Sequence, residues 1–159
     1  MTVRAARVVL DTNVLLSIFV FRDRRLVAIR DRLTTHEWQA LTNAPCLTEF
    51  ERVSVRPQFK LDEPQHRQIM AEYSALATAV TAAPPADYQL PRCKDGEDQK
   101  FLELARDGGA DWLITSDKAL LVLNRRQRLD GRFRILTPVQ ALSDEPAWLA
   151  PGAGEHSVE

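Results

Sequence analysis

The chain has 159 residues, of which 45% are apolar and 27% are charged, so it fits one folded domain and excludes wholesale disorder. The 21 basic and 22 acidic side chains leave a net charge of -1, which argues against a general polyanion binder. No apolar run approaches the roughly 20 residues that span a bilayer, and the two cysteines are too far apart to indicate a zinc site or a disulfide framework. We therefore expect a soluble cytoplasmic protein without membrane contact.

The chain begins with a strand pattern that leads directly into a helix. Residues 7–10 form an apolar run ending at Asp11, and Thr12 and Asn13 can cap a helix that begins nearby. Strand and helix patterns then alternate, with helices expected over 24–33, 44–56, 62–80, from the acidic turn at 94–98 to Gly108, over 118–123 and over 138–142, and strands over 38–42, 112–115 and 133–136. This alternation indicates parallel βαβ units with right-handed crossovers, so we predict an α/β fold in which helices flank a central parallel sheet.

The domain boundary is expected near residue 142. Residues 1–142 carry the strand and helix patterns and form the predicted single domain. The last stretch, residues 143–159, contains Pro146, Pro151 and two glycines, a composition that predicts a flexible tail without chemistry.

Four acidic residues occupy positions where parallel sheets bind their ligands, beyond the carboxyl ends of the strands. They are Asp11 after the first strand, Glu49 on the helix after the second strand, Asp98 in the first turn of the helix that precedes the strand at 112–115, and Asp117 after that strand. Taken singly, each acid could instead cap a helix, complement a helix dipole, close a turn or face the solvent. Their order along the chain is what favours convergence on one edge of the sheet.

Carboxylates that converge in this way repel one another unless they bind cations. Ligands that are all oxygen select Mg²⁺ or Mn²⁺ over Zn²⁺, and the three histidines, His36, His66 and His156, lack the spacing of a metal site. Two such ions would activate a water molecule and stabilise the leaving oxygen of a phosphodiester. The residues thus predict phosphodiester hydrolysis.

Four stretches of the sequence together resemble the successive signatures of PIN-domain proteins. They are residues 8–17 with Asp11-Thr12-Asn13, residues 47–50 with Glu49, residues 95–105 with Asp95 and Asp98, and residues 110–121 with Thr115-Ser116-Asp117. The likeness covers about residues 5–142 and is strongest to the bacterial branch that includes the toxins of toxin–antitoxin systems. Gly96 departs from this branch, which often has proline at that position.

The resemblance implies a three-layer, Rossmann-like PIN domain with the activity of a Mg²⁺- or Mn²⁺-dependent endoribonuclease. By position it implies that the catalytic acids and metal ligands are Asp11, Glu49, Asp98 and Asp117, with Asp95 as an additional metal ligand. It also implies that Asn13, Thr115 and Ser116 orient these carboxylates or bound water. The implied partners are an RNA substrate and a cognate antitoxin protein, and we also expect a homodimer.

Contacts to RNA phosphates are expected from arginines, because a guanidinium binds phosphate in a planar, bidentate manner. The leading candidates are Arg22, Arg24, Arg25, Arg125 and Arg126. The alternative interpretation places these side chains on solvated helix and loop faces.

Other functions stay open at this point. A PIN-like scaffold could bind RNA or protein without cutting it, although a pure binder has no need for acids that face phosphate. The enzyme could also be a housekeeping RNA-processing nuclease rather than a toxin. A phosphatase of the aspartyl-phosphate type would start from the same acid after the first strand, but it would need a second acid where this chain has Asn13.

Overall fold

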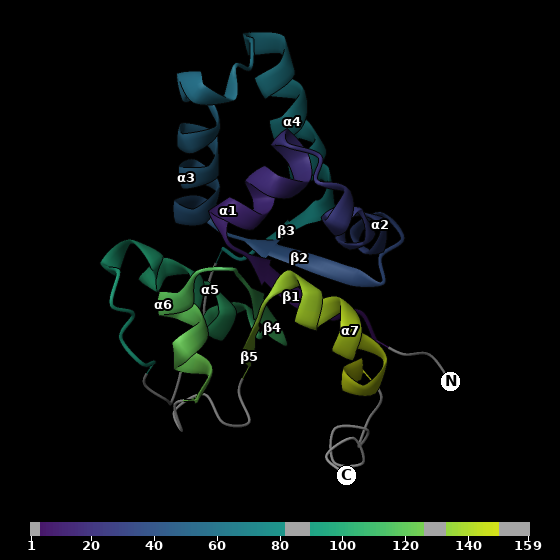
Figure 1. Cartoon of the computed structure of the whole chain (residues 1–159), viewed down its shortest axis with the longest axis vertical. Helices are drawn as coiled ribbons and strands as arrows, with labels where there is room; N and C mark the ends of the chain where they lie inside the picture. Colours follow the sequence, from purple (N-terminus) through teal and green to yellow (C-terminus); the bar gives the residue numbers. More distant parts are fainter. Residues whose placement is uncertain (1–3, 82–89, 126–132, 150–159) are drawn as a thin grey trace.

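A sheet of five parallel strands forms the centre of the computed structural model, which describes residues 4–81, 90–125 and 133–149. The strand order is β3-β2-β1-β4-β5, and every neighbouring pair is parallel (Figure 1). The strands are β1 (Ala6–Leu10), β2 (Trp38–Thr42), β3 (Ala77–Ala79), β4 (Trp112–Ile114) and β5 (Arg134–Leu136). Because the chain passes from β1 to one side of the sheet and then to the other, the strand order reverses between β1 and β4, which is where such sheets bind ligands.

Helices connect the strands and account for most of the remaining described chain. They are α1 (Thr12–Leu15), α2 (Val27–Thr34), α3 (Ala44–Ser54), α4 (Glu63–Leu76), α5 (Gln99–Gly108), α6 (Lys118–Leu121) and α7 (Pro138–Leu149). A π-helical turn, Leu16–Val20, follows α1, and short 3₁₀ turns occur at Arg24–Leu26, Pro57–Phe59, Gly96–Asp98 and Val122–Arg125. Within the described residues, no helix is both long enough and apolar enough to cross a membrane.

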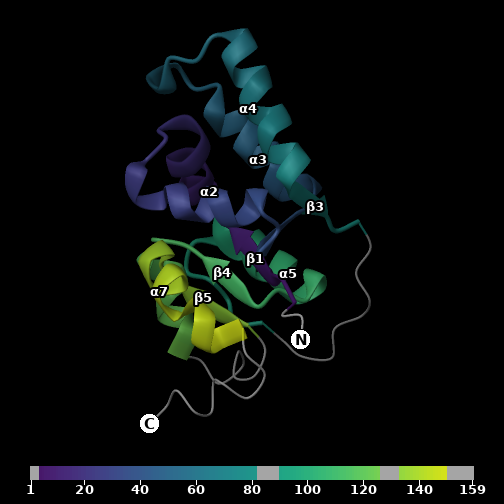
Figure 2. The same cartoon turned by 90° about the vertical axis from the view of Figure 1, so that its right-hand side faces the viewer.

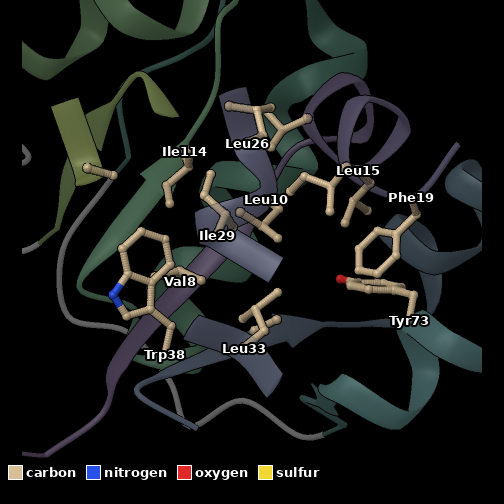
Figure 3. Close-up of a cluster of buried hydrophobic side chains, with 14 of the residues drawn as sticks. Val8, Leu10, Leu15, Phe19, Leu26, Ile29, Leu33, Trp38, Tyr73 and Ile114 are labelled. Atoms are coloured by element: carbon tan, nitrogen blue, oxygen red, sulfur yellow. The ribbon is translucent and has the colours of Figure 1, made fainter. Parts of the chain in front are cut away.

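The two faces of the sheet pack into separate hydrophobic cores. On β1, Val8 and Leu10 point into the core that α2, α4 and α7 cover (Figure 3), whereas Val9 points into the core formed with α5 and α6. Trp38 of β2 and Trp112 of β4 meet edge to face in the first core, with ring centroids 5.1 Å apart. Figure 2 shows α2 and α7 on one side of the sheet and α5 on the other. The predicted three-layer α/β fold with a central parallel sheet is therefore confirmed.

The structure corrects two of the predicted helix ends. The helix expected over residues 62–80 ends at Leu76, and Ala77–Ala79 forms the edge strand β3, in which Ala77 pairs with Ala40 of β2. The alanine-rich sequence there continues the helical pattern, so only pairing with β2 reveals the strand. The helix expected over residues 138–142 continues to Leu149, while residues 150–159 of the expected tail lie outside the described residues.

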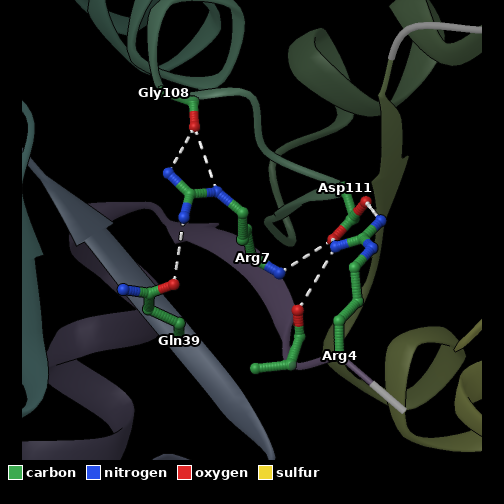
Figure 4. A network of polar contacts seen from close by, with 6 residues as sticks. Arg4, Arg7, Gln39, Gly108 and Asp111 are labelled. Carbon is green, nitrogen blue, oxygen red and sulfur yellow. Dashed lines mark hydrogen bonds and ion pairs between the residues drawn. The ribbon is translucent and has the colours of Figure 1, made fainter. Parts of the chain in front are cut away.

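At the amino end of the sheet, a network of polar contacts joins β1 to its neighbours (Figure 4). The Asp111 carboxylate accepts hydrogen bonds from the Arg7 backbone N–H at 2.8 Å and from both terminal nitrogens of Arg4. The Arg7 guanidinium donates to the Gly108 carbonyl at the end of α5, at 2.7 Å, and to Gln39 of β2, at 3.1 Å. These contacts fix the positions of three strands and one helix relative to one another.

Candidate active site

Asp11 follows β1 directly and is almost completely buried, with 4% of its surface exposed. One carboxylate oxygen accepts a hydrogen bond from the Val14 backbone N–H at 2.8 Å, so Asp11 caps α1. The other oxygen accepts a hydrogen bond from the Thr115 hydroxyl, just after β4. The same hydroxyl accepts a hydrogen bond from the Asp117 backbone N–H at 2.9 Å. Asp11 is thus a helix cap, and it is also held against the loop that carries Asp117.

Glu49 reaches the same region from α3. This helix begins directly after β2, where the Asn43 side chain caps it. One Glu49 oxygen accepts a hydrogen bond from the Thr12 hydroxyl at 2.5 Å, and the other lies 2.5 Å from the Lys100 ammonium of α5. Since only 14% of the Glu49 side chain is exposed, Glu49 points inward rather than into bulk solvent.

Asp98 and Asp117 bring two carboxyl groups close together. Asp98 lies at the start of α5, and Asp117 caps α6 by accepting a hydrogen bond from the Ala119 backbone N–H at 2.8 Å. The closeness of the Asp117 carboxyl group makes ionisation of Asp98 less favourable.

The four predicted acids, Asp11, Glu49, Asp98 and Asp117, line a single pocket of about 270 Å³. The lining residues come from the starts of α1, α5 and α6 and from the second half of α3 and the residues just after it. Its other lining residues are Thr12, Asn13, Arg52, Val53, Arg56, Glu97 and Phe101. The convergence that strand and helix order predicted is a feature of the structure, while the chemical roles of the acids stay predictions.

Burial and mutual repulsion raise the pKa values of two of these acids. Burial raises the pKa of Asp11 to about 6, against the hydrogen bonds from Thr115 and Val14 and with help from the charges of Asp117 and Glu49. Burial, the close Asp117 carboxyl group and the charges of Asp95 and Asp11 raise the pKa of Asp98 to about 7. Raised carboxyl pKa values in a pocket are typical of functional sites.

Glu49 has the opposite shift because it has a cation beside it. Burial acts to raise its pKa, but the hydrogen bonds from Lys100 and Thr12, together with the Lys100 charge, outweigh burial and hold the pKa below its usual value. Glu49 is therefore the pocket acid whose negative charge is already balanced within the protein.

The remaining predicted ligand and orienting residues differ in how close they come to the pocket. Asp95 is exposed, does not line the pocket, and accepts a hydrogen bond from the Glu97 backbone N–H at 3.0 Å, while its charge contributes to the raised pKa of Asp98. Asn13 is exposed and lines the pocket, and the Thr115 hydroxyl donates a hydrogen bond to the Asp11 carboxylate. Ser116 is exposed and does not line the pocket.

Of the arginines predicted to bind RNA, the three that the structure describes do not line the pocket. Arg22 is 3.2 Å from Glu72 of α4, Arg25 is 2.8 Å from Asp23, and Arg24 is exposed. Their role as RNA contacts stays a prediction, and local charge density did not show which of them have acidic partners. The side chain of Arg125 and all of Arg126 lie outside the described residues.

Two arginines that the sequence interpretation did not select, Arg52 and Arg56, do line the pocket. Arg52 lies three residues after Glu49, on the same side of α3, and Arg56 lies just beyond the end of this helix. That spacing from a predicted acid is the signal that could have found them. Lys100 was also missed, although it follows Asp98 by only two residues.

The donor set suits a hard divalent cation, because carboxylate oxygens are the ligands that Mg²⁺ and Mn²⁺ take. Within the described part of the chain, no three His, Cys, Asp or Glu side chains are arranged to hold an ion. Lys100 and Thr12 engage both oxygens of Glu49. The raised pKa of Asp98 reflects excess negative charge in the pocket, which a cation would neutralise.

Comparison with known proteins agrees with this geometry. The family model for the PIN domain matches residues 7–119, well over half of the chain, and the match includes all four pocket acids. A comparison with curated proteins gives no match. PIN domains are generally nucleases and typically use divalent metals. The match runs from β1 into α6, and it agrees with the five-stranded parallel sheet and with the acids at the carboxyl edge of that sheet. The chain therefore belongs to the PIN domain family.

Proposed function

We propose that this protein is a metal-dependent endoribonuclease that acts as the toxin of a toxin–antitoxin pair in the cytoplasm. The observation that carries the catalytic part is the convergence of Asp11, Glu49, Asp98 and Asp117 in one pocket of a PIN domain. The toxin role is supported by the likeness of the motifs around Asp11 and Asp117 to the toxin branch of the family.

In this proposal, Asp11, Asp98 and Asp117 hold Mg²⁺ or Mn²⁺, and Glu49 and Asp95 complete or support the set. The bound ion supplies water activation and stabilisation of the leaving oxygen of the phosphodiester. Thr115 keeps the Asp11 carboxylate in place, which lowers the cost of organising the ligands. The pKa of Asp98 is raised to about 7, so metal binding, which needs the ionised carboxylate, competes with protonation of this acid. Hydrolysis of this kind leaves 5'-phosphate and 3'-hydroxyl ends.

Arg52 and Arg56 are the proposed contacts to the RNA backbone. An acidic pocket repels a phosphate, so a substrate needs cations at the rim, and both guanidiniums are exposed beside the acids. Arg52→Ala or Arg56→Ala should weaken RNA binding and reduce the slope of log affinity against log salt by about 1, as expected for one lost phosphate contact. Arg24→Ala is the matched control, since Arg24 is exposed but does not line the pocket. An equal loss in the Arg24 variant would contradict the assignment.

The reaction is tested by incubating mixed RNA with the protein in Mn²⁺ and in EDTA, with a small phosphate ester as a parallel substrate. We expect RNA cleavage in Mn²⁺, none in EDTA, and no ester hydrolysis. RNA binding without cleavage would support a non-catalytic module instead, and ester hydrolysis would support a phosphatase.

The toxin role is tested separately, by expressing the protein in bacteria with and without the product of any small neighbouring reading frame. We expect growth arrest that this product relieves, and no arrest with Asp11→Asn. Normal growth during expression of an active nuclease would favour housekeeping RNA processing. Light scattering of the purified protein tests the expected homodimer.

A further inference from the structure

Lys100 contacts the candidate site, yet the proposed reaction does not use it. It lies in the first turn of α5, two residues after Asp98. Its ammonium is 2.5 Å from a Glu49 oxygen, donates to the Glu97 backbone carbonyl, and lies 5.1 Å from the centre of the Phe101 ring. The side chains of Lys100 and Glu49 are 17% and 14% exposed, so this ion pair is largely shielded from solvent.

The ion pair between Lys100 and Glu49 lies next to a pocket that has more acidic than basic side chains. The lining includes the carboxyl groups of Asp11, Glu49, Glu97, Asp98 and Asp117, against the guanidiniums of Arg52 and Arg56. Both arginines are exposed. Among the ion pairs of the described residues, only that of Lys100 reaches an acid of the pocket. Among the described residues, Lys100 is thus the cation that is ion-paired with an acid of the pocket, although it is not itself a lining residue.

We propose that Lys100 is a tethered counter-ion of the metal site. Its ammonium forms an ion pair with the Glu49 carboxylate when no metal is bound, and it moves away from Glu49 when a divalent cation binds. This inference rests on the proposed metal-dependent function. An ammonium and a divalent cation a few ångströms apart repel each other strongly in a partly dry pocket, so both cannot contact Glu49 at full strength. Lysine suits this role because its charge is compact and its four-carbon stem is flexible, so the head group can move without disturbing α5.

The proposal makes Lys100 a competitor of the metal. In the metal-free protein it reduces repulsion among the acids, and a cation must displace it to reach Glu49. Its removal should therefore destabilise the metal-free protein and strengthen metal binding. If Lys100 instead oriented Glu49 as a ligand, its removal would weaken metal binding, so the two roles predict opposite signs.

The test is calorimetric titration of Mn²⁺ into the metal-free full-length protein and two variants. Lys100→Met removes the ammonium and keeps an unbranched stem. Arg52→Met is the matched control, because it removes one positive charge from the pocket lining that does not form an ion pair with Glu49. We expect Mn²⁺ to bind Lys100→Met about tenfold more tightly than the parent, within the usual range of coupling between two sites, and Arg52→Met to differ less from the parent.

Thermal melting gives a second readout. Metal-free Lys100→Met should melt at a lower temperature than the parent, and Mn²⁺ should raise its melting temperature by a larger amount. If Lys100→Met folds poorly, Lys100→Gln is titrated in its place with the same expectations.

Mn²⁺ binding by Lys100→Met that is equal to or weaker than that of the parent would overturn the counter-ion role, as would an equal gain in Arg52→Met. In these outcomes the parent binds Mn²⁺ and the proposed function stands. If the parent and both variants all fail to bind Mn²⁺, the metal-dependent function fails together with this inference.

Discussion

Asp111 and Asp11 lie at opposite ends of the neighbouring strands β4 and β1, and their surroundings differ in one respect. Asp111, just before β4, accepts hydrogen bonds from the Arg4 guanidinium and the Arg7 backbone, so its negative charge has a cationic partner. Asp11, just after β1, accepts hydrogen bonds only from neutral groups among the described residues, and the charges of Asp117 and Glu49 act against its ionisation.

The comparison separates two uses of a carboxylate in one sheet. At the amino end, hydrogen bonds and charge are balanced within the protein, and the result is a fixed joint between strands. At the carboxyl end, hydrogen bonds hold Asp11 and Asp117 in place without a cationic partner among the described residues, which is the condition of a site that binds a cation. Replacing Asp11 by asparagine should therefore affect cleavage, and replacing Asp111 by asparagine should affect stability alone.

The largest expected effect is on catalysis. Asp11→Asn keeps the shape of the side chain and one oxygen that can accept the hydrogen bond from Val14 or from Thr115, but removes the charge. We expect RNA cleavage to fall by more than roughly a hundredfold, because even the outer partners of metal ligands contribute 10–100-fold. Asp111→Asn, the matched variant at the other end, should cleave at the parental rate. Parental cleavage by Asp11→Asn would refute the role of this acid.

The next effect is on stability as a function of pH. The pKa of Asp11 is about 6 in the folded protein, above its ordinary value of 3.8, so the folded state binds this proton more tightly than the unfolded chain does. The contribution of Asp11 to the free energy of unfolding should therefore be largest below about pH 4 and fall by about 3 kcal/mol between pH 4 and 7. The raised pKa of Asp98 acts in the same direction, and the lowered pKa of Glu49 acts in the opposite direction.

Melting curves in EDTA across this pH range measure the effect, with Asp11→Asn as the variant that should lose most of it. Saturating Mg²⁺ should flatten the same curve, since the cation stabilises the ionised acids. An Asp11→Asn variant whose melting temperature depends on pH in the same way as that of the parent between pH 4 and 7 in EDTA would contradict this prediction.

Metal binding should stabilise the protein by a similar or smaller amount. A ligand present at a hundred times its dissociation constant adds about 2.7 kcal/mol. We therefore expect Mg²⁺ or Mn²⁺ to raise the melting temperature of the parent at neutral pH. The rise should vanish in the double variant Asp11→Asn, Asp117→Asn and persist in Asp111→Asn. A parent whose melting is insensitive to both ions would count against a metal site.

The smallest effect is the loss of the joint at the amino end. Asp111→Asn weakens the charge-assisted bonds to Arg4 but leaves one oxygen for the Arg7 N–H. The Arg4 side chain is 65% exposed, so its ion pair contributes little, and we expect a loss of about 1 kcal/mol. Urea denaturation of the parent and of the variant measures it. Greater stability in the variant would mean that Asp111 is not balanced as described.

The sequence predicted the positions that depend on strand and helix order. Asp11 and Asp117 each follow a short apolar strand, and the carboxyl ends of neighbouring parallel strands lie at one edge, so their meeting needs no further information. Asp98 and Glu49 were placed by the same reasoning from the start of one helix and the interior of another. The fold class follows from the same alternation of patterns.

What could not be predicted depends on tertiary packing. The contact between Lys100 and Glu49 requires α3 and α5 to be rotated toward each other, and nothing in either segment alone specifies this rotation. Strand β3 was missed because Ala77–Ala79 has no strand pattern without its partner β2. The arginines near residue 24 were chosen for their number, but Arg22 and Arg25 are paired with Glu72 and Asp23.

The Thr115 hydroxyl has a consequence for how the site responds to thermal motion. It is fully buried, donates to the Asp11 side chain and accepts from the Asp117 backbone, so both of its bonding roles are used within the protein. The segments that follow β1 and β4 are thereby linked through a single atom and should move together. Fluctuations of the outer helices would then shift both acids in concert and leave the gap between them nearly constant, as an ion with short, fixed bond lengths requires.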